Sequence, residues 1–374
     1  MKRDDFALML VLAACGNASR LDGPAPPPSR PAAADHRPIG GVIPVEGDIK
    51  LRDFHFASGE SLPELRIHYT TLGTLHRDAA GRATNAVLVM HGTTGSGHQF
   101  FAPQFADELF GPGQPLDVRR FYIILPDDIG HGASSKPSDG LHARFPHYRY
   151  HDMVGAEHAL VAQLGVDHLR LVMGTSMGCM HSWMWAEQWP DEMDAVMPLA
   201  CLPVAIGGRN RWWREMIIQG IEQDPAWQQG DYRTEPEQAL RLAADIFMIA
   251  GANPIERQQA VPTPAAANAD LATRVAGFVA SHDANDLLYQ VASSEDYDPS
   301  RDLAQIAAPV MYVNSGDDFI NPPELGIAER EIQHVSRGQL VLIPASEKTH
   351  GHGTHTWAAL WKNHLVDLLR ASER

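Results

Sequence analysis

The stretch of sequence that decides the fold reads Leu169-Arg-Leu-Val-Met173, then Gly174-Thr-Ser-Met-Gly178, then a helical run that ends at Pro190. A short apolar strand, a Gly-x-Ser-x-Gly turn and an immediate helix are the parts of a nucleophile elbow, which holds one serine on a strained corner above a sheet. The two glycines let strand and helix pass closely on either side of Ser176. The alternative is an ordinary loop serine between two glycines, but the adjoining strand and helix favour the elbow. We therefore predict that Ser176 is a nucleophile.

Short apolar runs of the kind found in strands buried on both faces occur along much of the chain. They are 86–90, 121–125, 169–173, 196–199, 310–313 and 340–343. Helical stretches lie between most of them, and this alternation predicts an α/β fold with a mostly parallel sheet flanked by helices. Two earlier segments, 50–56 and 64–72, alternate apolar and polar residues around a Ser-Gly-Glu-Ser turn, which predicts an antiparallel hairpin at the sheet edge.

The strand–helix alternation stops between residues 204 and 298, where helical segments follow one another without a strand. We interpret residues 204–298 as a helical cap that divides the core into 41–203 and 299–374. Residues 16–40 are rich in Pro and Ala without periodicity, which predicts an extended tether. The length of 374 residues suits one large domain with an insertion, although two domains are the alternative.

The N-terminus has the pattern of an export signal. A basic pair, Lys2-Arg3, precedes an apolar run over 6–15 that is too short to span a bilayer. The run ends Leu12-Ala-Ala-Cys15-Gly16, which resembles the lipobox of bacterial lipoproteins, in which the signal is cut before the cysteine and that cysteine is lipidated. We therefore expect a signal peptide over 1–15, a lipid on Cys15, and a periplasmic or membrane-anchored protein. A wrongly assigned start or an uncleaved apolar tail is the alternative, because acidic residues follow the basic pair.

The remaining composition limits partners and cross-links. The formal net charge of -16 disfavours a nucleic acid or an anionic membrane surface as partner, so we expect membrane contact only through the lipid anchor. Cys179 falls on the helix after the elbow and Cys201 just after the next strand. We expect them to be two small buried side chains rather than a disulfide. The oligomeric state is not predicted.

A nucleophilic serine needs a base to take its proton and an acid to hold that base in the right tautomer. After an elbow, the partners follow in the chain order Ser, acid, His. Asp317 and Asp318 both follow the strand 310–313, and the carboxyl ends of parallel strands are where such sheets place site residues. Either aspartate could be the acid at this stage.

Three histidines in six residues compete for the role of base, His350, His352 and His355. His352 is the prediction, because its glycine neighbours on the loop after the last strand let the ring reach Ser176. A metal site made by the three imidazoles is the less favoured alternative, since a closed site needs a fourth ligand and a rigid scaffold. We therefore expect no metal and no cofactor.

Acyl transfer also needs two backbone N–H groups aimed at the oxyanion of the tetrahedral intermediate. Met177, directly after the nucleophile, supplies one of them. The other should come from the loop 91–97 after the first parallel strand, where Thr93 is the best candidate.

Together these residues resemble the α/β-hydrolase superfamily and, within it, the homoserine O-acetyltransferase group. The resemblance covers most of residues 64–367 and is most specific in the cap, at Arg214-Glu-Met-Ile217 and at Asp224-Pro-Ala-Trp-Gln-Gln-Gly-Asp-Tyr232. It favours Asp318 as the acid, because α/β-hydrolases commonly have a proline four residues after the acid and Pro322 stands there. It also implies that Arg214 lies near the pocket mouth and meets a substrate carboxylate. A helix-surface ion pair is the alternative for Arg214.

Two departures from the group bear on function. Members usually carry Asp after the catalytic histidine, where this chain has Gly353, and a second Gly in the elbow, where it has Thr175. Export would also separate the enzyme from acetyl-CoA. The leading hypothesis is therefore a serine hydrolase that cleaves small-molecule carboxylic esters with Ser176, His352 and Asp318. The alternatives are an acyltransferase that moves an acyl group from a coenzyme A thioester to an amino acid hydroxyl, and a non-catalytic protein on the same fold.

Overall fold

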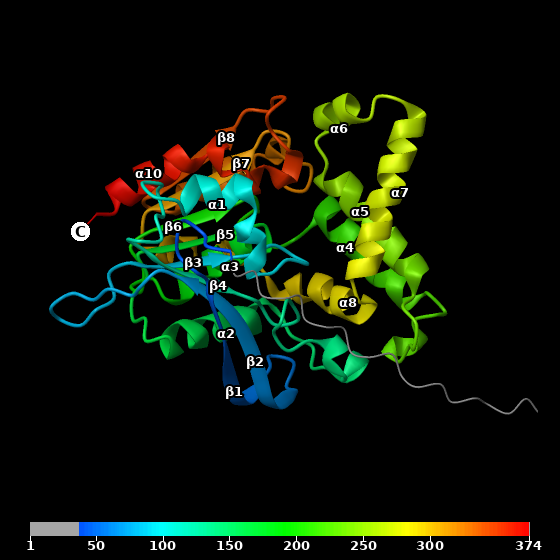
Figure 1. Ribbon diagram of the computed structural model, residues 1–374, viewed down its shortest axis with the longest axis horizontal. Coiled ribbons are helices and arrows are strands. Elements are labelled where there is room, and N and C mark those ends of the chain that lie inside the picture. The colour runs from blue at the N-terminus through cyan, green and yellow to red at the C-terminus, as the bar shows by residue number, and fades with distance from the viewer. Residues whose placement is uncertain (1–36, 374) are drawn as a thin grey trace, which may run out of the picture. The chain divides into compact units, whose positions relative to one another are not determined.

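The computed structural model describes residues 37–373, and eight strands in that range form one sheet in the order β1-β2-β4-β3-β5-β6-β7-β8 (Figure 1). The strands span Val45–His55 (β1), Ser61–Leu72 (β2), Ala86–Met90 (β3), Tyr122–Pro126 (β4), Leu171–Thr175 (β5), Val196–Leu199 (β6), Val310–Ser315 (β7) and Gly338–Ile343 (β8). β1 and β2 form an antiparallel hairpin, β2 pairs antiparallel with β4, and the pairs from β4 to β8 are parallel. The predicted α/β fold class, with its mostly parallel sheet, is confirmed.

Helices cover both faces of this sheet, which is why its central strands are mainly apolar. Every residue of β3, β5 and β6 is buried. One face packs against α2 (Tyr150–Gln163) and α3 (Met177–Gln188), and the other against α1 (Pro103–Leu109) and α10 (Lys362–Ala371). A short helix, α9 (Ile327–Glu331), lies between β7 and β8. No helix within 37–373 is long and apolar enough to cross a membrane.

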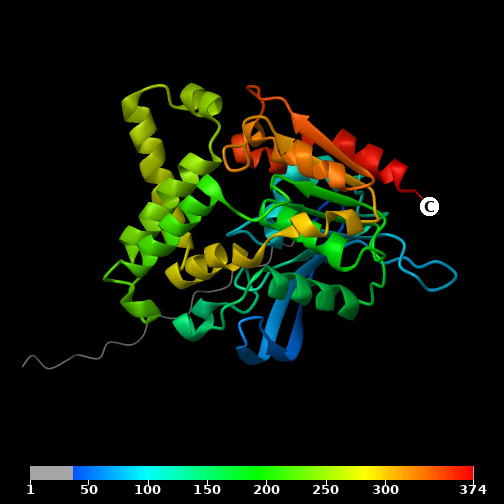
Figure 2. The same ribbon diagram turned by 180° about the vertical axis from the view of Figure 1, so that it is seen from behind.

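Five helices occupy the segment between β6 and β7: α4 (Gly208–Glu222), α5 (Glu237–Gly251), α6 (Pro254–Ala260), α7 (Pro264–Ser281) and α8 (Ala284–Ala292). Figures 1 and 2 show α4, α5 and α7 standing together beside the sheet. Periodicity did not predict α6 or α8. Both begin at capping residues, because the side chains of Asn253 and Asp283 accept hydrogen bonds from the first turn of each helix.

The prediction of two free thiols is wrong, because Cys179 and Cys201 form a disulfide with their Cα atoms 5.8 Å apart. α3 packs directly on β6, which brings the helix position of Cys179 opposite the strand exit at Cys201. Sequence order alone did not reveal this proximity. Both side chains are fully buried.

The predicted signal peptide, the lipidation site Cys15 and most of the tether lie outside the described residues. The end of the tether does not: Ile39 is buried in the core and forms a bridge with Val42. The folded part therefore begins slightly before residue 41.

Candidate active site

The elbow places Ser176 in a conformation that few residues adopt. Its φ is +56° and its ψ is -105°, between the end of β5 and the start of α3. Both glycines are required by close backbone contact. A Cβ on Gly174 would lie 2.1 Å from the carbonyl oxygen of Gly178, and one on Gly178 would lie 2.1 Å from that of Met90. The helix can therefore begin immediately after the serine, with its N-terminus directed at the site.

Three side chains from distant parts of the chain form one hydrogen-bonded series at the carboxyl edge of the sheet. His352 Nε2 lies 2.9 Å from Ser176 Oγ, and His352 Nδ1 lies 2.9 Å from Asp318 Oδ2. Both separations suit proton transfer between a nucleophile and a base that an acid orients. Asp317 instead accepts hydrogen bonds from the Gly351 N–H and from Asn253 of the cap, so it holds the histidine loop against α6.

Asp318 is buried, yet it stays ionised because every oxygen has donors. Oδ1 accepts from the N–H groups of Ile320 and Asn321 at 2.8 and 3.0 Å, and Oδ2 accepts from the Asn321 side chain at 3.2 Å. Burial raises the pKa of Asp318, but the charge and hydrogen bond of His352 and the bonds from Asn321 outweigh it, so that the pKa lies below its usual value. The Asp318 carboxylate is thus fixed in position and in charge. Sequence reasoning did not find Asn321.

The other two histidines of the loop do not join in a metal site. His350 stacks on Trp357 and lies 3.1 Å from a carboxylate oxygen of Glu256 in α6. His355 packs edge-on against His352, and burial lowers its pKa to about 3, so it stays neutral at physiological pH. Within residues 37–373, these three imidazoles do not converge on a common point.

The loop after β3 lies against Ser176. A Cβ on Gly92 would lie 3.4 Å from the Ser176 Cβ, so the backbone leading to Thr93 runs beside the serine. Met177 is the first residue of α3, where backbone N–H groups have no acceptor within the helix. Thr175, the residue that departs from the acetyltransferase pattern, accepts a hydrogen bond from Gln99, whose Oε1 accepts the Gly92 N–H. Thr175 therefore helps to hold the loop after β3 in place.

A buried cluster of acids and imidazoles lies behind this loop. Asp128, Glu157 and His181 are, within the described part of the chain, the one group of potential metal-ligating side chains that converge. His181 Nδ1 lies 2.8 Å from Glu157 Oε1, and Trp185 donates to the other oxygen of Glu157 at 2.6 Å. Burial raises the pKa of Glu157 to about 7. Burial and the neighbouring Glu157 together raise the pKa of Asp128 well above its usual range. Burial therefore disfavours the charged form of both carboxyls.

This cluster reaches the loop through His91. Its Nε2 accepts the Asp128 N–H at 3.1 Å, and its Nδ1 donates to the Gly92 carbonyl at 2.8 Å. The sequence patterns did not single out these acids, although Asp128 stands two residues after β4 at the carboxyl edge of the sheet. The rule that singled out Asp317 and Asp318 applies equally to Asp128.

Arg214 is buried in α4 and has neutral partners. It donates to Ser294 Oγ at 3.0 Å and to Asn210 Oδ1 at 3.1 Å, and its guanidinium lies over Trp213. No carboxylate among residues 37–373 lies within 4.0 Å of it, so it is not a helix-surface ion pair. The Tyr150 hydroxyl is also buried near Arg214: burial raises the pKa of Tyr150, and the charge of Arg214 opposes that rise.

A cavity of about 830 Å³ lies between the cap and the loop after β7. Its wall is mainly apolar and includes Met180, Leu202, Ile206, Phe319 and Leu325, with Asp318 at one side. Such a cavity is the usual form of a small-molecule site. Asp318 is the member of the hydrogen-bonded series that lines it, and the buried Arg214, predicted near the pocket mouth, does not line it.

Comparison with known proteins agrees with this geometry. Residues 85–348 match the model of the alpha/beta hydrolase fold family. The chain is 30% identical over 307 residues to the homoserine O-acetyltransferase of Pelobacter propionicus, covering 71% of this chain and 80% of that one. The chain belongs to the alpha/beta hydrolase family.

Within that family it is a homoserine O-acetyltransferase-like protein, and hence an enzyme of the acyltransferase or esterase type. Two solved structures share its fold at low identity. The homoserine O-acetyltransferase from Bacillus anthracis has a TM-score of 0.77 at 18% identity and covers 87% of this chain and 98% of its own. An acetylester hydrolase from Corynebacterium glutamicum has a TM-score of 0.76 at 21% identity, and the match covers 88% of this chain and 97% of the hydrolase.

Proposed function

We propose that this enzyme transfers an acyl group, through an ester of Ser176, from a coenzyme A thioester to the hydroxyl of a homoserine-like amino acid. The observation that carries the proposal is the hydrogen-bonded series Ser176–His352–Asp318 at 2.9 Å for each step. The relatives named homoserine O-acetyltransferase favour transfer over the hydrolysis predicted from the sequence.

The first half-reaction forms the acyl-enzyme. His352 Nε2 takes the proton of Ser176 Oγ as the oxygen attacks the thioester carbonyl. The N–H groups of Met177 and Thr93 stabilise the oxyanion, and each such donor is worth about a hundredfold to a thousandfold in rate. The intermediate then expels the thiol, which takes the proton held by His352.

The second half-reaction needs an acceptor at the same carbonyl. His352 takes the proton of the acceptor hydroxyl, the new oxyanion occupies the same two N–H groups, and Ser176 recovers its proton as it leaves. Arg214 is the residue in the described chain that we assign to the acceptor carboxylate. It is a buried cation whose partners are neutral, and a carboxylate would give it a charge-assisted pair.

Hydrolysis of a carboxylic ester is the second candidate, and Gly353 is the observation that favours it. The acetyltransferase group usually carries Asp there, and a glycine has no side-chain carboxylate to pair with the acceptor ammonium group. The predicted export would also remove the enzyme from coenzyme A thioesters, and fractionation of Cys15→Ala cells tests that prediction. With water as the acceptor, the same acyl-enzyme is hydrolysed.

The test measures release of coenzyme A thiol from acetyl-CoA with and without homoserine, beside hydrolysis of p-nitrophenyl acetate. We expect Ser176→Ala to abolish both reactions. Arg214→Gln should raise KM for homoserine by about tenfold to a hundredfold, because a charge-assisted bond is lost, and should spare the acetylation of Ser176. Arg211→Gln is the matched control, because this half-exposed arginine on the same helix bonds to Glu215 and does not line the cavity.

Thiol release that does not depend on homoserine, with rapid turnover of the ester, would replace transfer by hydrolysis. Equal turnover of the ester by wild type and Ser176→Ala would refute the acyl-enzyme itself.

A further inference from the structure

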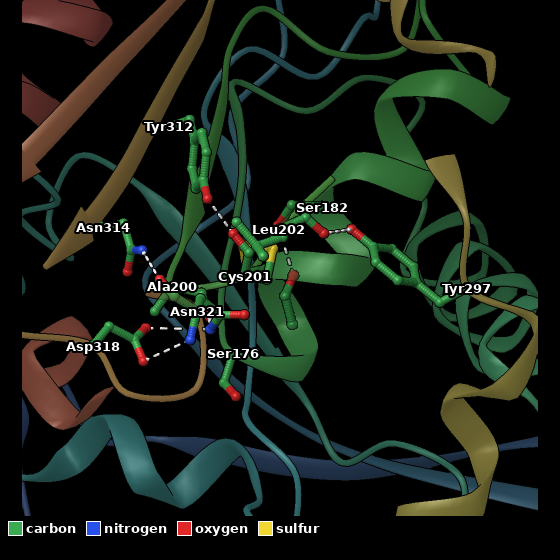
Figure 3. Close-up of a disulfide and its surroundings, with 12 residues drawn as sticks. Ser176, Ser182, Ala200, Cys201, Leu202, Tyr297, Tyr312, Asn314, Asp318 and Asn321 are labelled. Carbon is green, nitrogen blue, oxygen red and sulfur yellow. Dashed lines mark hydrogen bonds between the residues drawn. A yellow bond between two sulfur atoms is a disulfide. The ribbon is translucent and has the colours of Figure 1, made fainter. Parts of the chain in front are cut away.

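The disulfide joins the helix of the nucleophile to the segment that leaves the next strand (Figure 3). Cys179 lies three residues after Ser176 in α3, and Cys201 lies two residues after the end of β6. The cross-link therefore fixes the distance between the elbow and residues 200–202.

Residues 200–202 are held by their carbonyl groups, each of which accepts a side-chain hydrogen bond. Asn321 Nδ2 donates to Ala200 at 3.0 Å, the hydroxyl of Tyr312 donates to Cys201, and that of Tyr297 donates to Leu202 at 3.0 Å. Ala200 has a φ of +65°, a strained value for a residue with a side chain, which persists only where the surroundings enforce it. The disulfide is the covalent part of those surroundings.

Asn321 connects this segment with Asp318. One hydrogen of its amide group goes to the Ala200 carbonyl and the other to Asp318 Oδ2 at 3.2 Å, while its backbone N–H donates to Asp318 Oδ1 at 3.0 Å. These contacts form a closed ring of bonds. The ring runs from Ser176 along α3 to the disulfide, then through Ala200 and Asn321 to Asp318, and returns to Ser176 through His352. Figure 3 shows Asn321 between Asp318 and the segment that carries Cys201.

We propose that the Cys179–Cys201 disulfide positions Asp318 relative to Ser176, and that it makes the activity of this site depend on the redox state in which the chain folds. The proposal rests on the acyl-enzyme function above. When the bond is absent, the covalent tie between α3 and residues 200–202 is lost. The segment 200–202 then relaxes the positive φ of Ala200, and Asn321 loses either its contact with Ala200 or its contact with Asp318.

The chemistry of the switch is a dithiol exchange. A dithiol reductant supplies two electrons and two protons, the S–S bond breaks to give two cysteine thiols, and the reductant closes to a cyclic disulfide. Both sulfur atoms are buried, so exchange requires the protein to open or to fold in the presence of the reductant. The oxidised form is thus expected in an exported protein and the reduced form in a reducing compartment.

The experiment compares the oxidised protein, the protein refolded in dithiothreitol, and the double variant Cys179→Ala/Cys201→Ala. Peptide mapping without reduction first verifies the cross-link. We expect the rate of Ser176 acetylation by p-nitrophenyl acetate to fall by about tenfold to a hundredfold in the double variant and in the protein refolded in dithiothreitol. A small misplacement of the reacting groups lowers a rate by about that factor. We also expect the acid limb of the pH–rate profile to move to lower pH, because a displaced Asp318 stabilises the imidazolium of His352 less.

Ser182→Ala is the matched control, because Ser182 is buried on the same helix and its hydroxyl bonds only within α3, to Gly178. It should leave the profile unchanged. Loss of thermal stability alone, with the rate and the acid limb unchanged in the double variant, would overturn the proposal, as would the absence of the cross-link from oxidised protein. Absence of Ser176 acetylation in oxidised wild type would instead refute the proposed function.

Discussion

Asp318→Asn should inactivate the enzyme by changing the tautomer of His352. Both oxygens of Asp318 accept from donors, with two backbone N–H groups at Oδ1 and with His352 and Asn321 at Oδ2. An amide has one acceptor. Its oxygen will face the two backbone donors, which cannot move, so its NH2 group will face the ring. His352 must then accept at Nδ1 and carry its hydrogen on Nε2, where it cannot take the proton of Ser176.

The magnitude follows from this loss of the base. A wrong tautomer in an otherwise intact Ser-His-Asp series lowers kcat by about 10⁴-fold, which corresponds to roughly 5.5 kcal/mol of transition-state stabilisation. Stopped-flow acetylation of Ser176 by p-nitrophenyl acetate measures the step directly. Circular dichroism and thermal melting check that the variant is folded.

Asp317→Asn is the matched control, because it changes the adjacent residue in the same way. Its amide keeps one oxygen for the Gly351 N–H, so we expect a loss of about tenfold or less from the loosened histidine loop. A tenth of the wild-type rate in Asp318→Asn would contradict the change of tautomer, as would a larger loss of rate in Asp317→Asn than in Asp318→Asn.

Two further predictions concern stability. Burial raises the pKa of Glu157 from about 4.5 to about 7, so the folded state binds the extra proton and its stability falls as pH rises from 4.5 to 7. Urea titrations should show that the stability of Glu157→Gln rises by about 3 kcal/mol relative to wild type across that window. Gly178→Ala should destabilise the fold by about 3 kcal/mol or more, because its Cβ meets the Met90 backbone; Gly155→Ala, where a Cβ meets nothing within 4 Å, should not. Equal urea midpoints for the two alanine variants would contradict the close contact.

The sequence by itself determined the sheet, the elbow and the order in which the site residues appear. These are local properties: a run of apolar residues predicts a buried strand such as β3 or β6, and Gly-x-Ser-x-Gly between strand and helix predicts a strained serine. The glycines beside His352 and the strand before Asp318 also lie within a few residues of what they predict.

The tertiary structure alone decided the contacts between distant segments. It showed the cross-link from Cys179 to Cys201, which are 22 residues apart, and the bonds of Asn321 to both Ala200 and Asp318. It also brought Glu157 of α2 beside Asp128 and gave Arg214 its neutral surroundings. Burial, a shifted pKa and a disulfide depend on which atoms lie nearby in space, and hydrophobic periodicity records only which face of an element is covered.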